Sequence, residues 1–387
     1  MNRWPTKPLG ELLKVQNGFA FKSELFNEDR KGVPIIRIRD LARGSSETFY
    51  AGEDDPAFVV QNGDFLIGMD GEFRCYRWRG GRALLNQRVC RLQHFSPEIN
   101  PSYVFHGIND HLREIEANTA FVTVKHLSSK QIANIEMSVP PLAEQQRIVA
   151  LLDEADELRK LRAQADRRTA ALLPALFHGM FGDPAVNPKC WPTRRLRELG
   201  AKVSDGPFGS NLKSSHYTPA GVRVIRLQNI GVGCLVDKDR AYISPGHFDS
   251  LRKHECLPGD VLVGTLGDPN LRACILPPEI PQALNKADCV QIRPNPEIAT
   301  AAFICWLLNL PSTLEMASGM ILGQTRARIS MGRLAELVVP VPPLPLQKEF
   351  AERVTEIRAL EAEQATSRHR LDALFQSLLH RAFNREL

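Results

Sequence analysis

Residues 139–145 read VPPLAEQ, and residues 341–347 read VPPLPLQ, 202 positions later. In both places a proline pair precedes a long run of charged residues with regularly spaced apolar side chains. Proline is tolerated at the first positions of a helix, because its missing N–H would have no helical partner there. We therefore expect the same long helix to begin twice in this chain, with Gln145 and Gln347 at matching positions.

The match extends over nearly the whole chain, because four earlier stretches return in the same order. They are WPT at 4–6 and 191–193, IRIRDL at 36–41 and IRLQNI at 225–230, GDFLIG at 63–68 and GDVLVG at 259–264, and LN at 85–86 and 284–285. The offset grows from 187 to 202 positions, so the second copy carries small insertions, which surface loops tolerate. The order of the matches predicts a tandem duplication.

Each copy has a part rich in short apolar runs and a helical part. The runs at 33–38, 64–68, 222–227 and 260–265 lie between Gly, Pro, Asn and Asp residues, as strands do, whereas residues 301–310 are typical of a buried helix. We predict an α+β fold in four segments. They are a first globule at residues 1–142, a spacer helix at 143–182, a second globule at 183–344 and a second spacer helix at 345–387.

Each predicted spacer helix carries an apolar stripe at heptad spacing. The predicted packing residues are Ile148, Ala155, Leu158, Leu172 and Leu176 in the first helix and Phe350, Ile357, Leu360, Leu371, Leu374 and Leu378 in the second. A single amphipathic helix cannot bury such a stripe, so we predict that the two helices pair as an antiparallel coiled coil. The pairing would create a pseudo-twofold axis with a globule at each end; packing of each helix on its own globule is the alternative.

One position distinguishes the two predicted helices. Pro174 lies in the last third of the first helix, and its repeat partner is Gln376. Proline removes a backbone donor and collides with the preceding turn. We therefore expect a kink in the first helix and none at the matching level of the second.

Composition limits the class of protein. The chain has 387 residues, 43% of them hydrophobic, and its 49 Lys and Arg against 44 Asp and Glu give a net charge of +5, which permits a nucleic-acid partner. Its eight cysteines contain no C-x-x-C pair, so reduced thiols are expected rather than a zinc ribbon or a disulfide scaffold. No apolar run approaches ~18 residues, and we expect a soluble cytoplasmic protein.

The sequence offers no catalytic constellation and no metal-ligand motif. The stretch 206–214 has the wrong spacing for a phosphate-binding loop, and neither an H-E-x-x-H nor a G-x-S-x-G motif occurs. Residues 100–103, NPSY, resemble the Asn-Pro-Pro-Tyr loop with which amino-methyltransferases hold a flipped base. The second proline and a glycine-rich cofactor loop are missing, so a proline-initiated helix is the preferred interpretation. The chain is therefore expected to bind rather than to react.

The strongest binding signal lies between Phe73 and Leu92, which holds six arginines, three aromatic residues and no acidic residue. Arginine matches both phosphate and the edge of guanine, and residues 74–79 alternate as in a strand, so one face could be presented to a DNA groove. A solvent-exposed strand without a DNA role is the alternative. The DNA-binding candidates of the first globule are Arg37, Arg39, Arg74, Tyr76, Arg77, Arg79 and Arg82.

The second globule has fewer candidates. They are Lys213, Arg226, Gln228, Asn229, Arg272, Gln324, Thr325, Arg326 and Arg328. Glutamine and asparagine can read adenine with two hydrogen bonds, although polar residues are common on any protein surface. The apolar framework matches between the copies while Arg39 corresponds to Gln228 and the arginine run diverges. This pattern indicates two copies of one reader tuned to different sequences.

The order of these features resembles one known family. A β-rich globule, a VPPL helix start, a long helix that ends near FGDP at 181–184, and then the whole unit again are similar to the specificity (S) subunit of type I restriction–modification systems. The resemblance covers essentially the whole chain. It implies that each globule is a target-recognition domain that reads one half of a bipartite double-stranded DNA site, and that the helices are the spacer that sets the gap.

The resemblance also implies partners and further residues. Two methyltransferase (M) subunits would dock on the helices, and restriction/translocase (R) subunits would join through them. S-adenosylmethionine, ATP and Mg would belong to these partners, and no cofactor or catalytic residue to this chain. Residues 19–26 and 206–214 would be corresponding loops at the head of each domain, and 123–125 and 325–327 paired loops near the DNA. The candidates that these loops add are Lys22, Thr123, Lys125 and Ser210.

The leading hypothesis is a non-catalytic DNA-specificity subunit. An alternative from another class is an enzyme, a DNA methyltransferase or nuclease fused to recognition domains, but it would require a cofactor or metal motif that the sequence does not offer. A third interpretation, an interaction scaffold with coiled-coil arms, does not explain the arginine-rich stretch between Phe73 and Leu92. The target sequence cannot be inferred from the chain.

Overall fold

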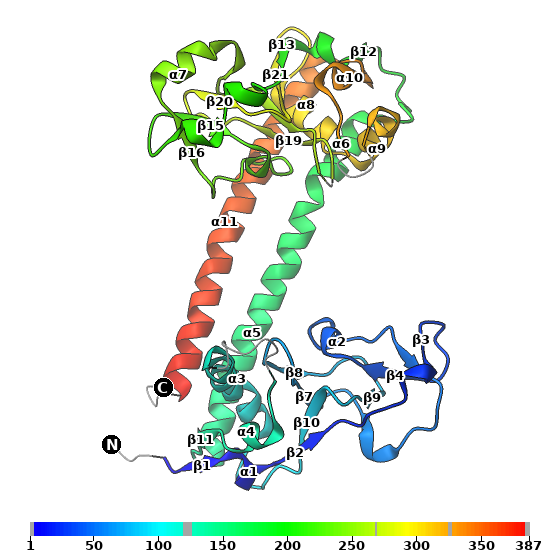
Figure 1. Cartoon of the computed structure of the whole chain (residues 1–387), viewed down its shortest axis with the longest axis vertical. Coiled ribbons are helices and arrows are strands. Elements are labelled where there is room, and N and C mark those ends of the chain that lie inside the picture. Colours follow the sequence, from blue (N-terminus) through cyan, green and yellow to red (C-terminus); the bar gives the residue numbers. More distant parts are fainter. Residues whose placement is uncertain (1–3, 119–125, 268, 324–326, 384–387) are drawn as a thin grey trace. The chain divides into compact units, whose positions relative to one another are not determined.

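A computed structural model gives the fold of the chain (Figure 1), and it describes residues 4–118, 126–267, 269–323 and 327–383. The chain divides into two compact units. Unit 1 comprises Met1–Arg162 and Ser367–Leu387, and unit 2 comprises Ala163–Thr366. Each unit combines helices with small sheets, as the predicted α+β class requires.

Unit 1 contains three sheets and four shorter helices. The first sheet joins, in spatial order, β2 (Lys14–Asn17), β10 (Val89–Gln93), β7 (Phe65–Gly68) and β8 (Cys75–Arg77). The second joins β3 (Phe26–Asn27), β5 (Phe49–Tyr50), β4 (Val33–Ile36), β9 (Ala83–Leu85) and β6 (Val59–Val60), and the third pairs β1 (Thr6–Pro8) with β11 (Glu136–Ser138). The helices are α1 (Leu9–Leu12), α2 (Ile38–Arg43), α3 (Pro101–Asn118) and α4 (Ser129–Ala133).

Unit 2 repeats the strand orders of unit 1. Its first sheet joins β13 (Gly200–Ser204), β21 (Cys289–Pro294), β18 (Val261–Gly264) and β19 (Arg272–Ile275). Its second joins β14 (Tyr217–Thr218), β16 (Ala241–Ile243), β15 (Val222–Ile225), β20 (Ala283–Asn285) and β17 (Glu255–Cys256), and its third pairs β12 (Thr193–Arg195) with β22 (Val338–Pro340). The helices α7 (Pro245–Ser250), α8 (Ala301–Leu308), α9 (Pro311–Met316) and α10 (Met331–Ala335) accompany them. The identical strand orders confirm the internal repeat.

The repeated glutamine of the helix start has the same buried role in both units. The side chain of Gln145 donates to the carbonyls of Glu98 and Pro140 (2.9 and 2.8 Å) and accepts from the Asn100 N–H (2.7 Å). Gln347 makes the corresponding three hydrogen bonds with the backbone of Ile298, Pro342 and Thr300. A fully buried amide needs such partners, so this glutamine fastens each long helix to its own unit.

Three further helical segments follow the two globules among the described residues. They are α5 (Leu142–Ala170), α6 (Leu172–Phe181) and α11 (Leu344–Phe383). The break between α5 and α6 comes three residues before Pro174, where proline cannot donate to the preceding turn, whereas α11 runs without a break past Gln376. The first helix is thus interrupted close to Pro174 and the second is not interrupted at Gln376, which is the difference that the proline predicted. Residues 100–103 form the start of α3, with Asn100 accepting from the Ser102 N–H (2.9 Å), as a proline-initiated helix does.

Each unit contains an antiparallel helix pair. In unit 1, Ile148 and Leu152 of α5 share a core with Leu379 of α11, and Arg159 further along α5 is ion-paired with Asp372 (2.7 Å), earlier in α11. In unit 2, Gln364 donates to Thr169 (2.9 Å), and the ring of Phe350 lies 5.6 Å from that of Phe177 in α6. Within each unit, the residue numbers of one helix thus increase in the direction in which those of the other helix decrease.

Several predicted packing residues do not lie in a helix–helix seam, which corrects the heptad interpretation. Leu158, Leu172, Leu360 and Leu374 are exposed, at 41–47% of their surface. Ile148 and Phe350 are fully buried, but in the cores of the two globules, against which Leu176, Ile357 and Leu378 also pack. Ala155 is buried and Leu371 is half-buried. The apolar spacing therefore serves two purposes, globule packing at the helix ends and an exposed leucine face between them.

The division into units differs from the predicted four segments. The spacer helices are not separate bodies, because each is divided between the units at Arg162 and Ala163 in α5 and at Thr366 and Ser367 in α11. The predicted boundaries after residues 142, 182 and 344 coincide with helix ends within one or two residues. They remain a prediction about domain organisation.

Candidate nucleic-acid interface

The candidate interface of each unit follows two neighbouring parallel strands. In unit 1, β4 and β9 run parallel and end at Ile36 and Leu85; in unit 2, β15 and β20 run parallel and end at Ile225 and Asn285. Chain segments that leave adjacent parallel strands at the same edge form a natural crevice for ligands. Side chains beyond this edge differ between the two copies, as Arg39 and Gln228 do, so the two units can differ here.

In unit 1 these segments line a groove of about 450 Å³. The groove is lined by Phe21, Ser23, Phe26, Arg37, Ile38, Arg39, Asn86, Gln87 and Arg88. It thus combines three arginines with aromatic rings and side-chain amides, and none of these lining residues is acidic. This composition suits both a phosphate backbone and base edges.

The first two arginines are directed by a buried carboxylate. Asp40 is 2% exposed and accepts a hydrogen bond from the Arg37 N–H (2.8 Å), so it holds the first turn of α2. Arg37 and Arg39 flank the turn with exposed side chains. The sequence IRIRD therefore folds into a helix start that presents two arginines, and the strand predicted over residues 33–38 ends at Ile36.

The third arginine belongs to a charged cluster. Arg88 Nη1 lies 2.9 Å from one carboxylate oxygen of Asp70, and His126 Nδ1 lies 2.7 Å from the other. The side chain of Asp70 is 20% exposed, whereas those of Arg88 and His126 are 56% and 53% exposed. A shielded carboxylate thus holds two solvent-facing nitrogen groups at the groove.

Unit 2 carries a basic and aromatic cluster at the matching edge. The Tyr217 ring lies between the Arg226 guanidinium, 5.8 Å from the ring centre, and the Lys286 ammonium, 5.5 Å away. Hydrogen bonds from Gln228 (2.8 Å) and then from Arg226 lower the pKa of Asp239, which therefore stays ionised. Arg226 and Gln228, both predicted DNA contacts, are thus brought together on one carboxylate.

A second cluster of unit 2 contains Arg328. Its guanidinium lies 5.4 Å from the centre of the exposed Phe208 ring, and Arg328 Nε lies 2.8 Å from Asp288 Oδ1. An aromatic face under an arginine and a carboxylate at its edge restrict the orientation of the guanidinium. Arg328 was predicted as a DNA contact, whereas Phe208 and Asp288 were not.

Asn229 was predicted to contact DNA, and this prediction is wrong. Its side chain is fully buried, donates to the carbonyls of Val236 and Asp239 (both 3.0 Å) and accepts from the Arg226 N–H (3.0 Å). All its hydrogen-bonding groups are used to fix the loop at 230–239. Asp40 is its repeat partner in unit 1 and has the same structural role, which the repeat alone would have suggested.

Arg77 was predicted on an exposed strand face, and the structure places it in a packed one. It donates to Ser102 Oγ (2.9 Å), and its guanidinium lies 5.4 and 5.2 Å from the ring centres of Phe65 and Phe105. Strand pairing aligns Arg77 with Phe65 as it aligns Ile275 with Val261, so an apolar residue takes its place in unit 2. Arg77 therefore packs the sheet against α3 and does not face the groove.

The remaining arginines of the stretch do not converge on one site. Arg74 is exposed and ion-paired with Glu72 (2.6 Å), Arg82 is exposed and ion-paired with Asp54, and Arg79 is exposed. Tyr76 is half-buried and packs beside a core cluster of unit 1. The strand predicted over 74–79 is shorter, Cys75–Arg77. The Trp78 N–H still donates to the Asp64 carbonyl (2.8 Å), but the Trp78 carbonyl accepts from the Gly63 N–H (2.9 Å), one position out of register.

The other predicted candidates lie near the edges of the loops. Lys22 and Lys213 precede matching 3-10 turns and are exposed, as is Ser210, whereas Arg272 is half-buried at the start of β19, the position that Arg74 has in unit 1. Thr123, Lys125, Gln324, Thr325 and Arg326 lie outside the described residues. Nothing in the structure tests their predicted role.

Sequence reasoning missed several groove residues. Gln87 and Arg88 line the groove in unit 1, Lys286 has the corresponding place in unit 2, and Asp70 and His126 orient Arg88. A signal for the first three was present, because they directly follow the repeated LN at 85–86 and 284–285. Divergence immediately after a matched framework marks the positions free to specialise.

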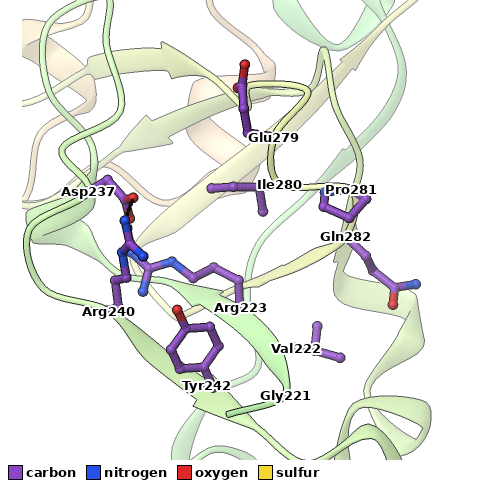
Figure 2. Close-up of a pocket in the computed structure, with 10 residues that line it drawn as sticks. All are labelled: Gly221, Val222, Arg223, Asp237, Arg240, Tyr242, Glu279, Ile280, Pro281 and Gln282. Carbon is purple, nitrogen blue, oxygen red and sulfur yellow. Dashed lines mark hydrogen bonds and ion pairs between the residues drawn. The ribbon is translucent and has the colours of Figure 1, made fainter. Parts of the chain in front are cut away.

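A further pocket of unit 2 lies at the opposite, starting end of β15 and has a volume of about 530 Å³ (Figure 2). Within it, Asp237 bridges Arg223 and Arg240 at 2.9 and 2.6 Å, and Arg223 lies 5.6 Å from the centre of the Tyr242 ring. Burial lowers the pKa of Arg223, and the Asp237 charge opposes this effect. Two arginines that share one carboxylate stabilise the loop and form no acid–base pair.

Other features of the described chain give no catalytic centre. The described residues contain no group of three or more His, Cys, Asp and Glu side chains placed to hold a metal ion. All eight cysteines are free thiols, and burial raises the pKa of Cys90, Cys289 and Cys305 to about 12, which makes them poor nucleophiles. None of the described helices is long and apolar enough to cross a membrane.

Comparison with known proteins shows what the chain is similar to. Residues 1–166 match the family model described as "Type I restriction modification DNA specificity domain". The EcoBI type I restriction enzyme specificity subunit of Escherichia coli is 28% identical over 99% of this chain and 86% of its own length. The MjaVIII specificity subunit of Methanocaldococcus jannaschii is 21% identical over 93% and 89%. The chain is thus related, over almost its full length, to type I specificity subunits, as its sequence predicted.

Solved structures show the same fold. The S subunit of the type I restriction–modification system from M. genitalium aligns with a TM-score of 0.58 at 16% identity, covering 98% of this chain and 96% of that one. A chain from the structure titled as the basis of complex assembly and conformational transition of the type I R-M system aligns with a TM-score of 0.60 at 19% identity, covering 100% and 99%. At these identities the likeness concerns the fold alone.

Proposed function

We propose that this chain is the non-catalytic DNA-specificity subunit of a type I restriction–modification system and that each unit reads one half of a bipartite duplex site. The observation that carries the proposal is the duplicated edge of the parallel strands. On one framework it holds Arg37, Arg39 and Arg88 in unit 1, and Arg226 and Lys286 around Tyr217 in unit 2. A shared framework with divergent basic side chains is what two readers of different DNA words require.

The long helices would act as the spacer between the two half-sites. The helical run of α5 and α6 begins in unit 1 and ends in unit 2, and α11 begins in unit 2 and ends in unit 1. The buried Gln145 and Gln347 fasten the helix starts to their units. The length of the helices would therefore set the number of base pairs between the half-sites. We also propose that the two globules are arranged with pseudo-twofold symmetry on an antiparallel coiled coil.

The exposed leucines of the helices support docking of partner subunits. Leu158 and Leu161 of α5 and Leu374 of α11 are exposed in unit 1, and Leu172 and Leu360 are exposed in unit 2. Leucines that two antiparallel helices leave uncovered are suited to burial against further helices. We propose that methyltransferase (M) subunits cover them, one at each unit, and that restriction/translocase (R) subunits join through the M subunits.

The chemistry of the system would then belong to the partners. S-adenosylmethionine, ATP and Mg would be bound by M and R subunits, and this chain would act in the cytoplasm on intracellular DNA. The alternative, a methyltransferase or nuclease fused to recognition domains, has no observation in its favour among the described residues. Calorimetry distinguishes the two, because the enzyme would bind S-adenosylmethionine without partners and the specificity subunit would not.

Genome-wide methylation profiling tests the proposal. DNA from the host strain and from a strain lacking this gene is sequenced so that modified bases are detected. We expect one bipartite motif, two short words separated by a fixed gap, to be methylated in the parent and unmethylated in the deletion strain. A methylation pattern that is unchanged by the deletion in a host that retains its methyltransferase genes would refute the proposal.

A further inference from the structure

The two units place different charged pairs around one set of equivalent backbone hydrogen bonds. In unit 1 the Met69 N–H donates to the Arg88 carbonyl (3.0 Å), and the Leu127 N–H donates to the Met69 carbonyl (2.7 Å). In unit 2, Thr265 and Ile329 make the same two hydrogen bonds, with Asp288 in the place of Arg88 (both 3.0 Å). The backbone therefore makes Arg88 equivalent to Asp288, and His126 equivalent to Arg328.

The arginine of the charged pair therefore stands at different positions of the repeat in the two units. In unit 1 the arginine precedes β10, and its carboxylate is Asp70. In unit 2 the arginine follows the segment at 322–327, and its carboxylate, Asp288, precedes β21. Neither arrangement is needed for the fold, because the strand order and the backbone hydrogen bonds are the same with both.

Both arginines are oriented and still accessible. Arg88 is 56% exposed and Arg328 is 39% exposed. Among the residues that the structure describes, Arg88 has Asp70 as its only polar partner, so most of its five N–H groups face solvent or the groove. Asp70 is in turn held by His126, and Arg328 is supported by the Phe208 ring.

An arginine that a carboxylate holds in one orientation while it stays exposed is suited to base reading. The fork of a guanidinium matches the O6 and N7 acceptors of guanine, and side-chain entropy is lost before binding when a carboxylate already fixes the fork. A phosphate contact needs charge but no such orientation. Gln87, beside Arg88 in the groove, can read adenine, so the edge can distinguish neighbouring bases.

We propose that these two charged pairs determine base preference: Arg88, positioned by Asp70 and His126, reads a guanine in one half-site, and Arg328, positioned by Asp288, reads a guanine in the other. The inference rests on the proposed function and adds the residues that carry the specificity. Because the two arginines stand at different positions of the repeat, the guanine occupies a different position in each DNA word.

The test is methylation profiling of strains in which the chromosomal gene carries one substitution. Arg88→Ala is expected to reduce the preference for guanine at one position of one half-site by roughly 5- to 150-fold and to leave the other half-site unchanged. Arg328→Ala is expected to relax one position of the other half-site only. Asp70→Asn should weaken the preference at the same position as Arg88→Ala, but by less, because the arginine remains.

Arg113→Ala is the matched control, because Arg113 is also an exposed arginine of unit 1 ion-paired with a carboxylate, that of Asp110, but it lies in α3 and does not line the groove. It should leave the motif unchanged. An unchanged motif in the Arg88→Ala strain would overturn the inference. So would a uniform loss of methylation at all sites, which marks a phosphate contact. A parent strain without any bipartite motif would refute the proposed function itself.

Discussion

At the residue scale, a charged or polar side chain in this repeat can serve packing or local structure and not DNA contact. Arg77 and Ile275 occupy equivalent strand positions, and Arg77 replaces the apolar side chain with a guanidinium that lies beside the rings of Phe65 and Phe105. Asn229 and Asp40 are polar but hold loops from inside. The alternation of the 74–79 stretch could not reveal this, because both faces of that strand are covered and neither is uniformly apolar.

Replacement of Arg77 should therefore affect stability and not specificity. Arg77→Ala removes the hydrogen bond to Ser102 and the contacts with Phe65 and Phe105, at a cost of about 1–3 kcal/mol to unit 1. Chemical denaturation measures this loss, and methylation profiling should give an unaltered motif. Arg79→Ala, at an exposed neighbour, is the control and should change stability little. A relaxed base preference in the Arg77→Ala strain would restore the original interpretation.

His106 should make unit 1 less stable in acid. It is buried, and burial lowers its pKa although its Nε2 lies 2.8 Å from the Asp153 carboxylate. The unfolded chain therefore binds a proton more readily, and stability decreases as pH falls through about 6.5, the ordinary histidine value. Hydrogen exchange of the α3 amides at pH 7.5 and 5.5 measures this decrease. His106→Gln should show a smaller difference between the two pH values; an equal difference would contradict the assignment.

At the scale of elements, the sequence predicted the helices and strands that are marked by the internal repeat or by the spacing of apolar residues. The two helix starts, the proline break and the apolar strands were all indicated by residues whose role depends on the local backbone. The heptad stripe was misread because Ile148 and Phe350 follow the same spacing as a coiled coil while they fill the globule cores. Periodicity identifies an apolar face, but it does not identify the surface that covers this face.

The buried glutamines are expected to be indispensable to their elements. Gln145→Leu would leave the carbonyls of Glu98 and Pro140 and the Asn100 N–H without their partner, at a cost of about 2–4 kcal/mol. Thermal unfolding should show the loss, and hydrogen exchange should place it in unit 1. Gln347→Leu should produce the same effect in unit 2. A neutral result for both substitutions would mean that the helix starts are held by the proline pairs alone.

At the scale of the whole molecule, the duplication means that one chain supplies two related binding surfaces. The helices α5 and α11 each belong to both units and connect them. Between α5 and α6 a single residue interrupts the helix, three positions before Pro174. Sequence reasoning reached this organisation from the ordered matches. It could not identify the base-reading side chains, because Asp70, Arg88 and His126 are brought together only by the strand pairing.

Helix length should control the gap between the half-sites. Insertion of one helical turn into α5 and of one turn at the facing level of α11 adds about 5–6 Å, which corresponds to one to two base pairs. We expect methylation profiling to show the same two words with a longer gap. Insertion in a surface loop such as 51–55 is the control and should leave the gap unchanged. Unaltered spacing after the paired helix insertions would contradict the spacer role.

The central claim is that each unit independently reads its own word, and exchange of one unit tests it most directly. In such a chain residues 183–344 are replaced by a second copy of residues 1–142, with α5, α6 and α11 retained. The equal strand orders and the shared glutamine anchors make this replacement structurally compatible. Methylation profiling should then find the first word at both ends of the site, in inverted orientation, with the original gap. Retention of the second original word in a chain that no longer contains residues 183–344 would contradict the account.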